Sequence, residues 1–137
     1  MGSDFDDVLT GSSGNDILAG GAGLNTLTGG SGADTFVIDP SALTEVGLVD
    51  VITDYSQSEG DKIDLGDLLE TAFGHAASAT DVADNVHLVQ TGGNTNVVVD
   101  TNGAAPGGDV IVATLNGIHN TVSVLYDDTH QTNVTHP

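Results

Sequence analysis

The residues with the clearest chemical signature recur every nine positions near the N-terminus. They are Asp7, Asp16, Asn25 and Asp34. Carboxylate and amide oxygens are hard ligands, and carboxylates stacked on neighbouring turns repel one another unless a cation lies between them. The spacing therefore predicts that several turns act together to bind a hard divalent cation.

These residues occupy the sixth position of four nine-residue repeats, which begin at Gly2, Gly11, Gly20 and Gly29. Glycine also holds the fourth position in three of the repeats, where it supplies the positive φ angle that a tight turn needs. The eighth position carries one large apolar residue in each repeat: Leu9, Leu18, Leu27 and Phe36. A flexible Gly- and Asp-rich linker is the alternative, and this fixed apolar position disfavours it.

The period predicts a coil in which six residues form a turn and three form a short strand. Two repeats make one coil, and coils stack at the strand spacing of about 4.8 Å. Asp7 then lies with Asn25, and Asp16 with Asp34. A flexible cage of carboxylate oxygens and turn carbonyls suits Ca²⁺ better than Mg²⁺. The metal-binding residues predicted within the repeats are Asp7, Gly11, Ser13, Asp16, Gly20, Ala22, Asn25, Gly29, Ser31 and Asp34.

The stretch GSSGNDILAGGAGLNTLTGGSGADTFVI resembles the calcium-binding nonapeptide repeats of repeats-in-toxin (RTX) proteins. The resemblance implies a calcium β-roll over residues 1–39. Asn25 departs from the pattern because it carries no charge, so the site between the first and third repeats should bind calcium more weakly. Phe5 replaces a glycine, which indicates an edge or capping repeat, with Asp4 and Asp6 as candidates to compensate.

The composition narrows the classes of function. The net charge is −19, from 20 acids and a single base, Lys62. This charge excludes binding to nucleic acid and to anionic membranes. The apolar residues are patterned and the mean hydropathy is slightly positive, so a protein that binds cations is favoured over a disordered acidic tail. The chain has no cysteine, no membrane-spanning apolar run and no N-terminal signal pattern, so we expect no membrane insertion.

Residues 36–74 are expected to continue the roll. Strands are predicted up to Ile38, over 49–55 and over 62–65, and a short helix over 66–73. The motifs DTFVI, DVITDY and GDKIDL resemble the segment that closes the roll in secreted RTX proteins. That resemblance implies further calcium ligands, first Asp54 and Asp61, and then Asp39, Asp50 and Asp64. Solvated turn acids are an equal alternative for the first two and are favoured for the other three. Lys62 is expected to pair with a nearby acid.

The C-terminal half reads as a β-rich cap. A helix is predicted to start at Ser78. Strands are predicted over 86–90 and 96–100, joined by a Gly-rich loop at 91–95, and then over 109–115 and 122–126. Residues 100–108 read as a turn-rich loop, and the polar tail, 127–137, is expected to fray.

The stretch GNTNVVVDTNGAAPGGDVIVATLNGI resembles the C-terminal target domain of type I secreted proteins, including large bacterial surface adhesins. This implies an uncleaved export signal read by an ABC transporter, a membrane fusion protein and an outer-membrane channel. It also implies an extracellular monomer that can be retained at the bacterial surface. The expected fold is all-β: a short parallel β-roll, residues 1–39, continued and capped by a β-rich region with one or two short helices, residues 40–137.

No catalytic pattern accompanies these motifs, so we expect no enzymatic activity. None of the five histidines lies in an HExxH motif, and no nucleophile elbow accompanies Asp127 and His130. The function predicted is a non-catalytic C-terminal region that stays open where calcium is scarce and folds on extracellular Ca²⁺. The alternatives are the RTX tail of a secreted enzyme or haemolysin, or a calcium-dependent carbohydrate-binding module. Ice binding is disfavoured because no turn position carries a regular Thr or Asn row.

Overall fold

The protein is described by a computed structural model over residues 6–43, 49–75, 77–101, 109–127 and 130–135. Three-residue strands alternate with turns at the N-terminus, and longer strands with two short helices follow. The elements are β1 (Val8–Thr10), β2 (Ile17–Ala19), β3 (Thr26–Thr28), β4 (Thr35–Val37), η1 (Pro40–Leu43), β5 (Asp50–Ile52), β6 (Lys62–Asp64), α1 (Gly66–Phe73), α2 (Ala79–Asn85), β7 (Val86–Thr91), β8 (Asn94–Asp100), β9 (Asp109–Asn116), β10 (Thr121–Leu125) and β11 (Gln131–Thr135).

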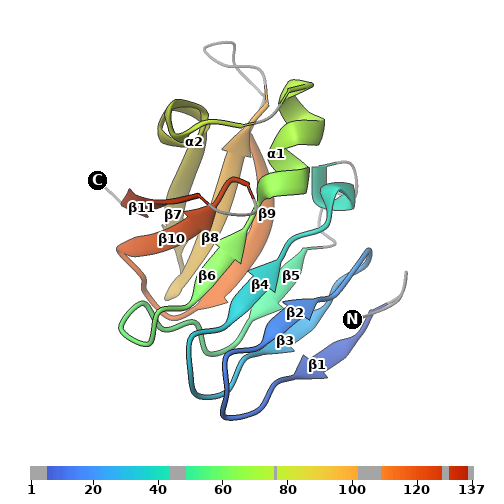
Figure 1. The fold of residues 1–137 in the computed structure, drawn as a ribbon, viewed down its shortest axis with the longest axis vertical. Helices are drawn as coiled ribbons and strands as arrows, with labels where there is room; N and C mark the ends of the chain where they lie inside the picture. Colours follow the sequence, from blue (N-terminus) through green and yellow to red (C-terminus); the bar gives the residue numbers. More distant parts are fainter. Residues whose placement is uncertain (1–5, 44–48, 76, 102–108, 128–129, 136–137) are drawn as a thin grey trace.

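Two sheets form opposite sides of a roll, as the nine-residue period predicts. One has the order β1-β3-β5-β9-β8-β7 and the other β11-β10-β6-β4-β2. β1, β3, β5 and β9 run parallel, as do β2, β4, β6 and β10. Successive strands of the repeats alternate between the two sheets, so the chain winds through stacked coils (Figure 1).

The core lies between the sheets and follows the eighth position of the repeat. Leu27 pairs with Ile52 and Ile52 with Leu115, while Phe36 pairs with Ile63 and Ile63 with Val124. All six side chains are fully buried. The apolar ladder of the repeats therefore continues through strands that lie outside the repeats.

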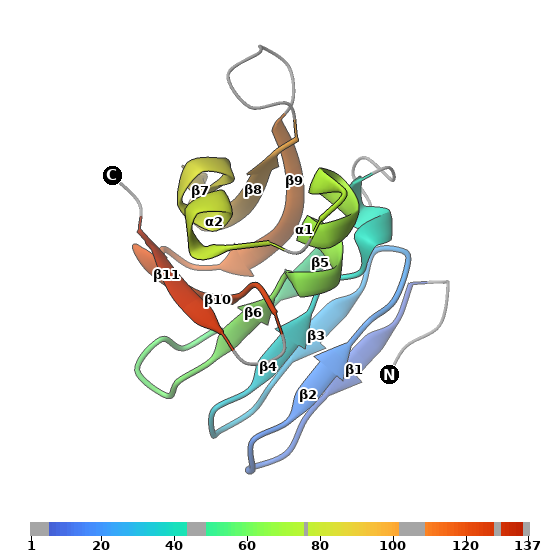
Figure 2. The same ribbon diagram turned by 45° about the horizontal axis from the view of Figure 1, so that its top comes forward.

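The far end of the roll is closed by antiparallel strands and helices. β7 and β8 form a hairpin on β9, β11 pairs with β10, and α2 contacts both β7 and β11 (Figures 1 and 2). The expectation of a frayed tail was wrong, because residues 131–135 form β11 and bury Val134 against the core. The hairpin turn is also tighter than predicted: Gly92 and Gly93, both at positive φ, allow the ladder to run to its end.

Both helices lie where the sequence placed them. α1 spans residues 66–73 and buries Leu68 and Leu69. α2 begins at a capping box in which Ser78 and Asp81 satisfy each other's backbone N–H groups. The strand predicted over 49–55 is shorter, since the chain turns after Ile52. Within the described ranges, neither helix is long and apolar enough to cross a bilayer.

Candidate metal centre

The turns of the roll stack in two columns, one at each end of its strands. The first, the Asp34 edge, consists of turns 11–16, 29–34 and 53–61. The second, the Asn25 edge, consists of residues 6–7, turn 20–25, residues 38–43 and residues 49–50. Parallel pairing of the strands places the sixth-position residues of each column directly above one another.

Three acids are stacked along the Asp34 edge. The Asp16 N–H donates to Asp34 Oδ1 at 2.9 Å, and the Asp34 N–H donates to Asp61 Oδ1 at the same distance. The stacking of Asp16 with Asp34 agrees with the sequence prediction. Lys62 pairs with Thr35, so the residues that precede them, Asp61 and Asp34, are stacked and Asp61 extends the column. Asp34 and Asp61 are 27 residues apart in the chain, whereas Asp16 and Asp34 are 18 apart.

Two carboxylates of this column, those of Asp34 and Asp61, are buried, which makes their negative charge costly. Asp34 is 0% exposed and Asp61 is 1% exposed, and burial raises the pKa of Asp61 above its ordinary value. Asp34 Oδ2 has no hydrogen-bond partner among the residues that the structure describes. A buried, unpartnered carboxylate oxygen is costly unless a cation compensates it. The column therefore fits a bound cation.

Backbone oxygens line the same space. A Cβ at Gly29 would collide with the Asp34 carboxylate, and a Cβ at Gly11 would collide with the Gly29 carbonyl and with Asp16 Oδ2. Glycine at these positions thus leaves turn carbonyls and carboxylates in close approach. This is the oxygen-rich, flexible ligand set that calcium prefers.

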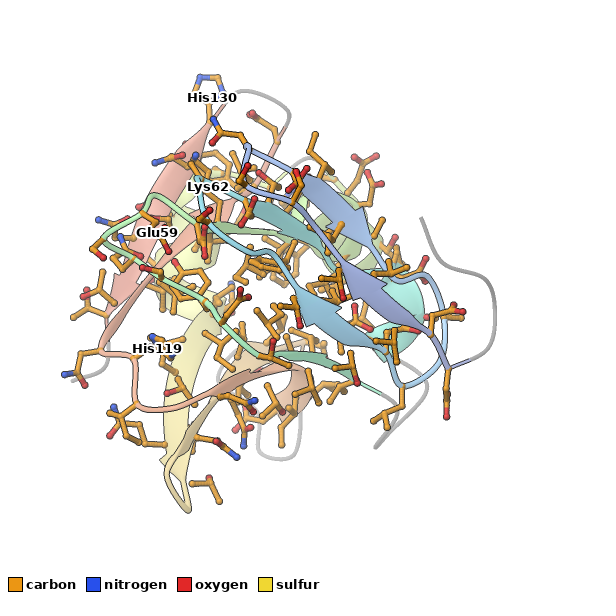
Figure 3. All side chains as sticks on the ribbon, turned by 90° about the horizontal axis from the view of Figure 1, so that it is seen from below. Glu59, Lys62, His119 and His130 are labelled. Carbon is orange, nitrogen blue, oxygen red and sulfur yellow. The ribbon has the colours of Figure 1, made fainter. Side chains whose placement is uncertain are left out.

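Turn 53–61 supports turn 29–34 from the neighbouring coil. Both oxygens of Asp54 accept backbone N–H groups, from Gly29 at 2.9 Å and from Gly30 at 2.8 Å. Glu59 Oε2 accepts the Gly32 N–H at 3.3 Å. Figure 3 shows Glu59 on turn 53–61, the turn that leads into Lys62. Lys62 donates to the Gly60 carbonyl at 3.3 Å. Asp54 and Asp61, which the sequence favoured among the later acids, thus both contact turn 29–34.

The Asn25 edge holds a different column. The Asp7 N–H donates to Asn25 Oδ1 at 2.9 Å, and Asn25 Nδ2 donates to Asp50 Oδ1 at 2.8 Å. Asp50 is 4% exposed, and its Oδ2 has no partner within the described parts of the chain. Burial raises the pKa of Asp50 from 3.8 to about 6. The sequence ranked Asp50 below Asp54 and Asp61, yet the structure places it in the column. The sequence did contain a signal for this role: Asp50 lies at the start of a predicted strand, much as Asp61 directly precedes the next one.

Asp39 and Asp64, the other candidates outside the repeats, each make a local hydrogen bond. Asp39 accepts the Ser41 N–H and Asp64 accepts the Gly66 N–H, each two residues along the chain. No three His, Asp or Glu side chains of the described residues converge on one point. Any metal site here must therefore draw many of its ligands from turn carbonyls. Phe5 and Asp4 lie outside the described residues.

Comparisons with known proteins agree with this geometry. Residues 1–36 match the RTX calcium-binding nonapeptide repeat in four copies. The solution structure of the AlgE6R3 subunit from the Azotobacter vinelandii mannuronan C5-epimerase is 28% identical, with a TM-score of 0.58; the match covers 95% of this chain and 83% of that one. The crystal structure of the C-terminal domain (RV) of MpAFP is 26% identical, with a TM-score of 0.56, covering 99% and 97%. No curated protein sequence matches the chain.

The N-terminal segment therefore consists of RTX repeats, and such repeats bind calcium. The architecture is a β-roll of the same type as these two solved domains. RTX repeats are typical of secreted proteins, and RTX repeat domains are generally non-catalytic.

Proposed function

We propose that this chain is the non-catalytic C-terminal region of a type I secreted bacterial protein, in which calcium binding drives folding outside the cell. The repeats of the roll lie in residues 1–39, and residues 40–137 continue the roll, cap it and carry the export signal. The parent protein that we favour is a large surface adhesin, retained at the bacterial surface.

The calcium ligands that we assign lie mainly at the Asp34 edge. They are the carboxylates of Asp16, Asp34, Asp54 and Asp61 with turn carbonyls of Gly11, Ser13, Gly29 and Ser31. Calcium would supply the positive charge that lets these acids lie close together out of water. Asp7, Gly20, Ala22 and Asn25 hold the corresponding positions at the Asn25 edge, where Asn25 has an uncharged amide in place of a carboxylate.

The observation that carries this proposal is that Asp34 Oδ2 is buried with no hydrogen-bond partner among the described residues, in a chain of charge −19. Such a chain repels itself when compact. At tenfold excess over its Kd, calcium at one site stabilises the folded state by roughly 1.4 kcal/mol. A few sites supply an amount comparable to the stability of a small domain, about 5 kcal/mol or more.

Calcium titration of metal-free protein tests the folding claim. We expect circular dichroism to show β structure appearing with calcium and disappearing with a chelator. Asp34→Ala, which removes the carboxylate without supplying an amide, should raise the calcium concentration at the midpoint severalfold. Asp84→Asn removes the same charge from an exposed position on α2 and should leave the midpoint in place. Full β structure without calcium would refute the switch.

The export claim rests on the sequence resemblance of the C-terminal half, and the similarity to a C-terminal domain of MpAFP supports it. A reporter fused to this chain, in cells with a type I channel, should be secreted. Removal of residues 86–137 should abolish export. Leu27→Asp disrupts the buried core within the repeats and leaves residues 40–137 unaltered, so export should persist. Secretion of the truncated chain would contradict the proposal.

A second candidate is the RTX tail of a secreted enzyme, and the similarity to a subunit of an epimerase favours it. A calcium-dependent carbohydrate-binding module is a third. Both retain the calcium-driven roll and differ in the parent protein or in an added ligand, so the calcium titration supports the shared element alone.

A further inference from the structure

Asn25 and Asp34 occupy the same position of the repeat, on opposite edges of the roll. Each is 0% exposed, and each uses Oδ1 to accept the N–H of the sixth residue one coil earlier, at 2.9 Å. The two side chains are nearly identical in shape and differ in one terminal atom. At Asp34 that atom is an oxygen without a partner among the described residues, and at Asn25 it is a nitrogen.

The Asn25 nitrogen is surrounded by oxygens. It donates to the Gly21 carbonyl at 3.1 Å, the Ala22 carbonyl at 3.4 Å and Asp50 Oδ1 at 2.8 Å. The orientation of the amide follows from the same network, because the Asp7 N–H requires an acceptor at Oδ1. The NH₂ group must therefore face the carbonyls and the carboxylate.

Two turn carbonyls and a carboxylate are also what a calcium ion would take from this turn. Taking up the proposed function, we infer that the Asn25 amide occupies the place of a cation at this edge. It satisfies the oxygens by hydrogen bonds, and it leaves a neutral group between Asp7 and Asp50 where the repeat would otherwise place a third carboxylate. The Asn25 edge is thus assembled without calcium between turn 20–25 and Asp50, and the Asp34 edge requires the ion.

The substitution Asn25→Asp tests this inference, with calcium counted by native mass spectrometry. We expect the variant to bind one more calcium ion than the unaltered chain and to need more calcium to fold. Asp34→Asn is the matched change at the other edge and should bind at least one ion fewer. An unchanged count in Asn25→Asp, beside a reduced count in Asp34→Asn, would overturn the inference.

Two further measurements cover a variant that does not fold. The double variant Asn25→Asp with Asp50→Asn restores the hydrogen bond between positions 25 and 50 at the charge of the unaltered chain but leaves the Gly21 and Ala22 carbonyls without that donor, so it should fold at a lower calcium concentration than Asn25→Asp alone. Crystals of the unaltered chain soaked in Tb³⁺ should show anomalous peaks at the Asp34 edge. A peak between Asn25 and Asp50 would overturn the inference.

The same measurements separate this inference from the proposed function. If the unaltered chain binds no calcium but Asn25→Asp acquires one ion, the calcium switch fails and the role of the Asn25 amide stands. If the unaltered chain binds calcium at both edges, the switch stands and the role of the amide fails.

Discussion

Within the repeats, the two edges of the roll have the same turn length and the same hydrogen bond, from a backbone N–H to the side-chain oxygen of the sixth residue. At one edge the stacked residues are Asp16, Asp34 and Asp61; at the other they are Asp7, Asn25 and Asp50. The backbone path is therefore shared, and the chemistry of each edge depends on one terminal atom. A regular repeat can therefore specify a scaffold while each turn either binds an ion or replaces the ion with a side-chain amide.

The largest expected difference concerns pH at a constant, saturating calcium concentration, where the chain is folded. Burial raises the pKa of Asp50 to about 6, so the folded chain holds this proton more tightly than the unfolded chain does. The stability that results is fully present below about pH 4 and is lost as pH rises through about 6. The difference from the ordinary value corresponds to about 3 kcal/mol. Urea denaturation of calcium-saturated protein between about pH 4 and pH 7 measures it.

Asp50→Asn is the control for this pH dependence. Asparagine can still accept the Asn25 hydrogen bond through its side-chain oxygen, but it does not titrate. The variant should lose the part of the pH slope that Asp50 contributes and be more stable than the unaltered chain at neutral pH in saturating calcium. An identical slope in both proteins would assign the pH dependence to other acids and remove this difference between the edges.

The smallest expected effect comes from the fifth position, where the edges are alike. Asp6 Oδ1 accepts the Leu24 N–H and Asn15 Oδ1 accepts the Ala33 N–H, each at 2.8 Å and at an exposed site. Asp6→Ala and Asn15→Ala should each lower the free energy of unfolding by about 0.5–1.5 kcal/mol in saturating calcium. Thermal denaturation should show a similar loss of stability in the two variants. A much larger loss for one of them would extend the contrast between the edges beyond the sixth position.

The sequence predicted the part of the fold that its own period determines. The glycines and the single apolar residue of each repeat determined the turns, the strands and the stacking of Asp16 on Asp34. The helices were also predictable, because the helical spacing of Leu65, Leu68, Leu69, Ala72 and Phe73 and the capping box at Ser78 are local signals.

The rest depended on contacts between residues far apart in the chain. β5 pairs with β9 and β6 pairs with β10, and the segments that connect them contain no repeat. The register of these pairs therefore cannot be read from a fixed spacing in the sequence. The same loss of period obscured Asp50, which lies 25 residues from Asn25 instead of 18. β11 was missed because its sequence is polar, and its strand structure comes from pairing with β10.

The two ends of the roll differ in how they finish. β7 and β11 form the outer strands at one end, whereas β1 and β2 form them at the other. Val8 and Ile17, on β1 and β2, are 76% and 75% exposed, whereas their equivalents one coil deeper, Thr26 and Thr35, are half-buried. Another coil would cover Val8 and Ile17 in the same way and leave everything downstream in register. Gene duplication, or a designer, could therefore lengthen this protein in steps of 18 residues ahead of β1 without redesigning its closed end.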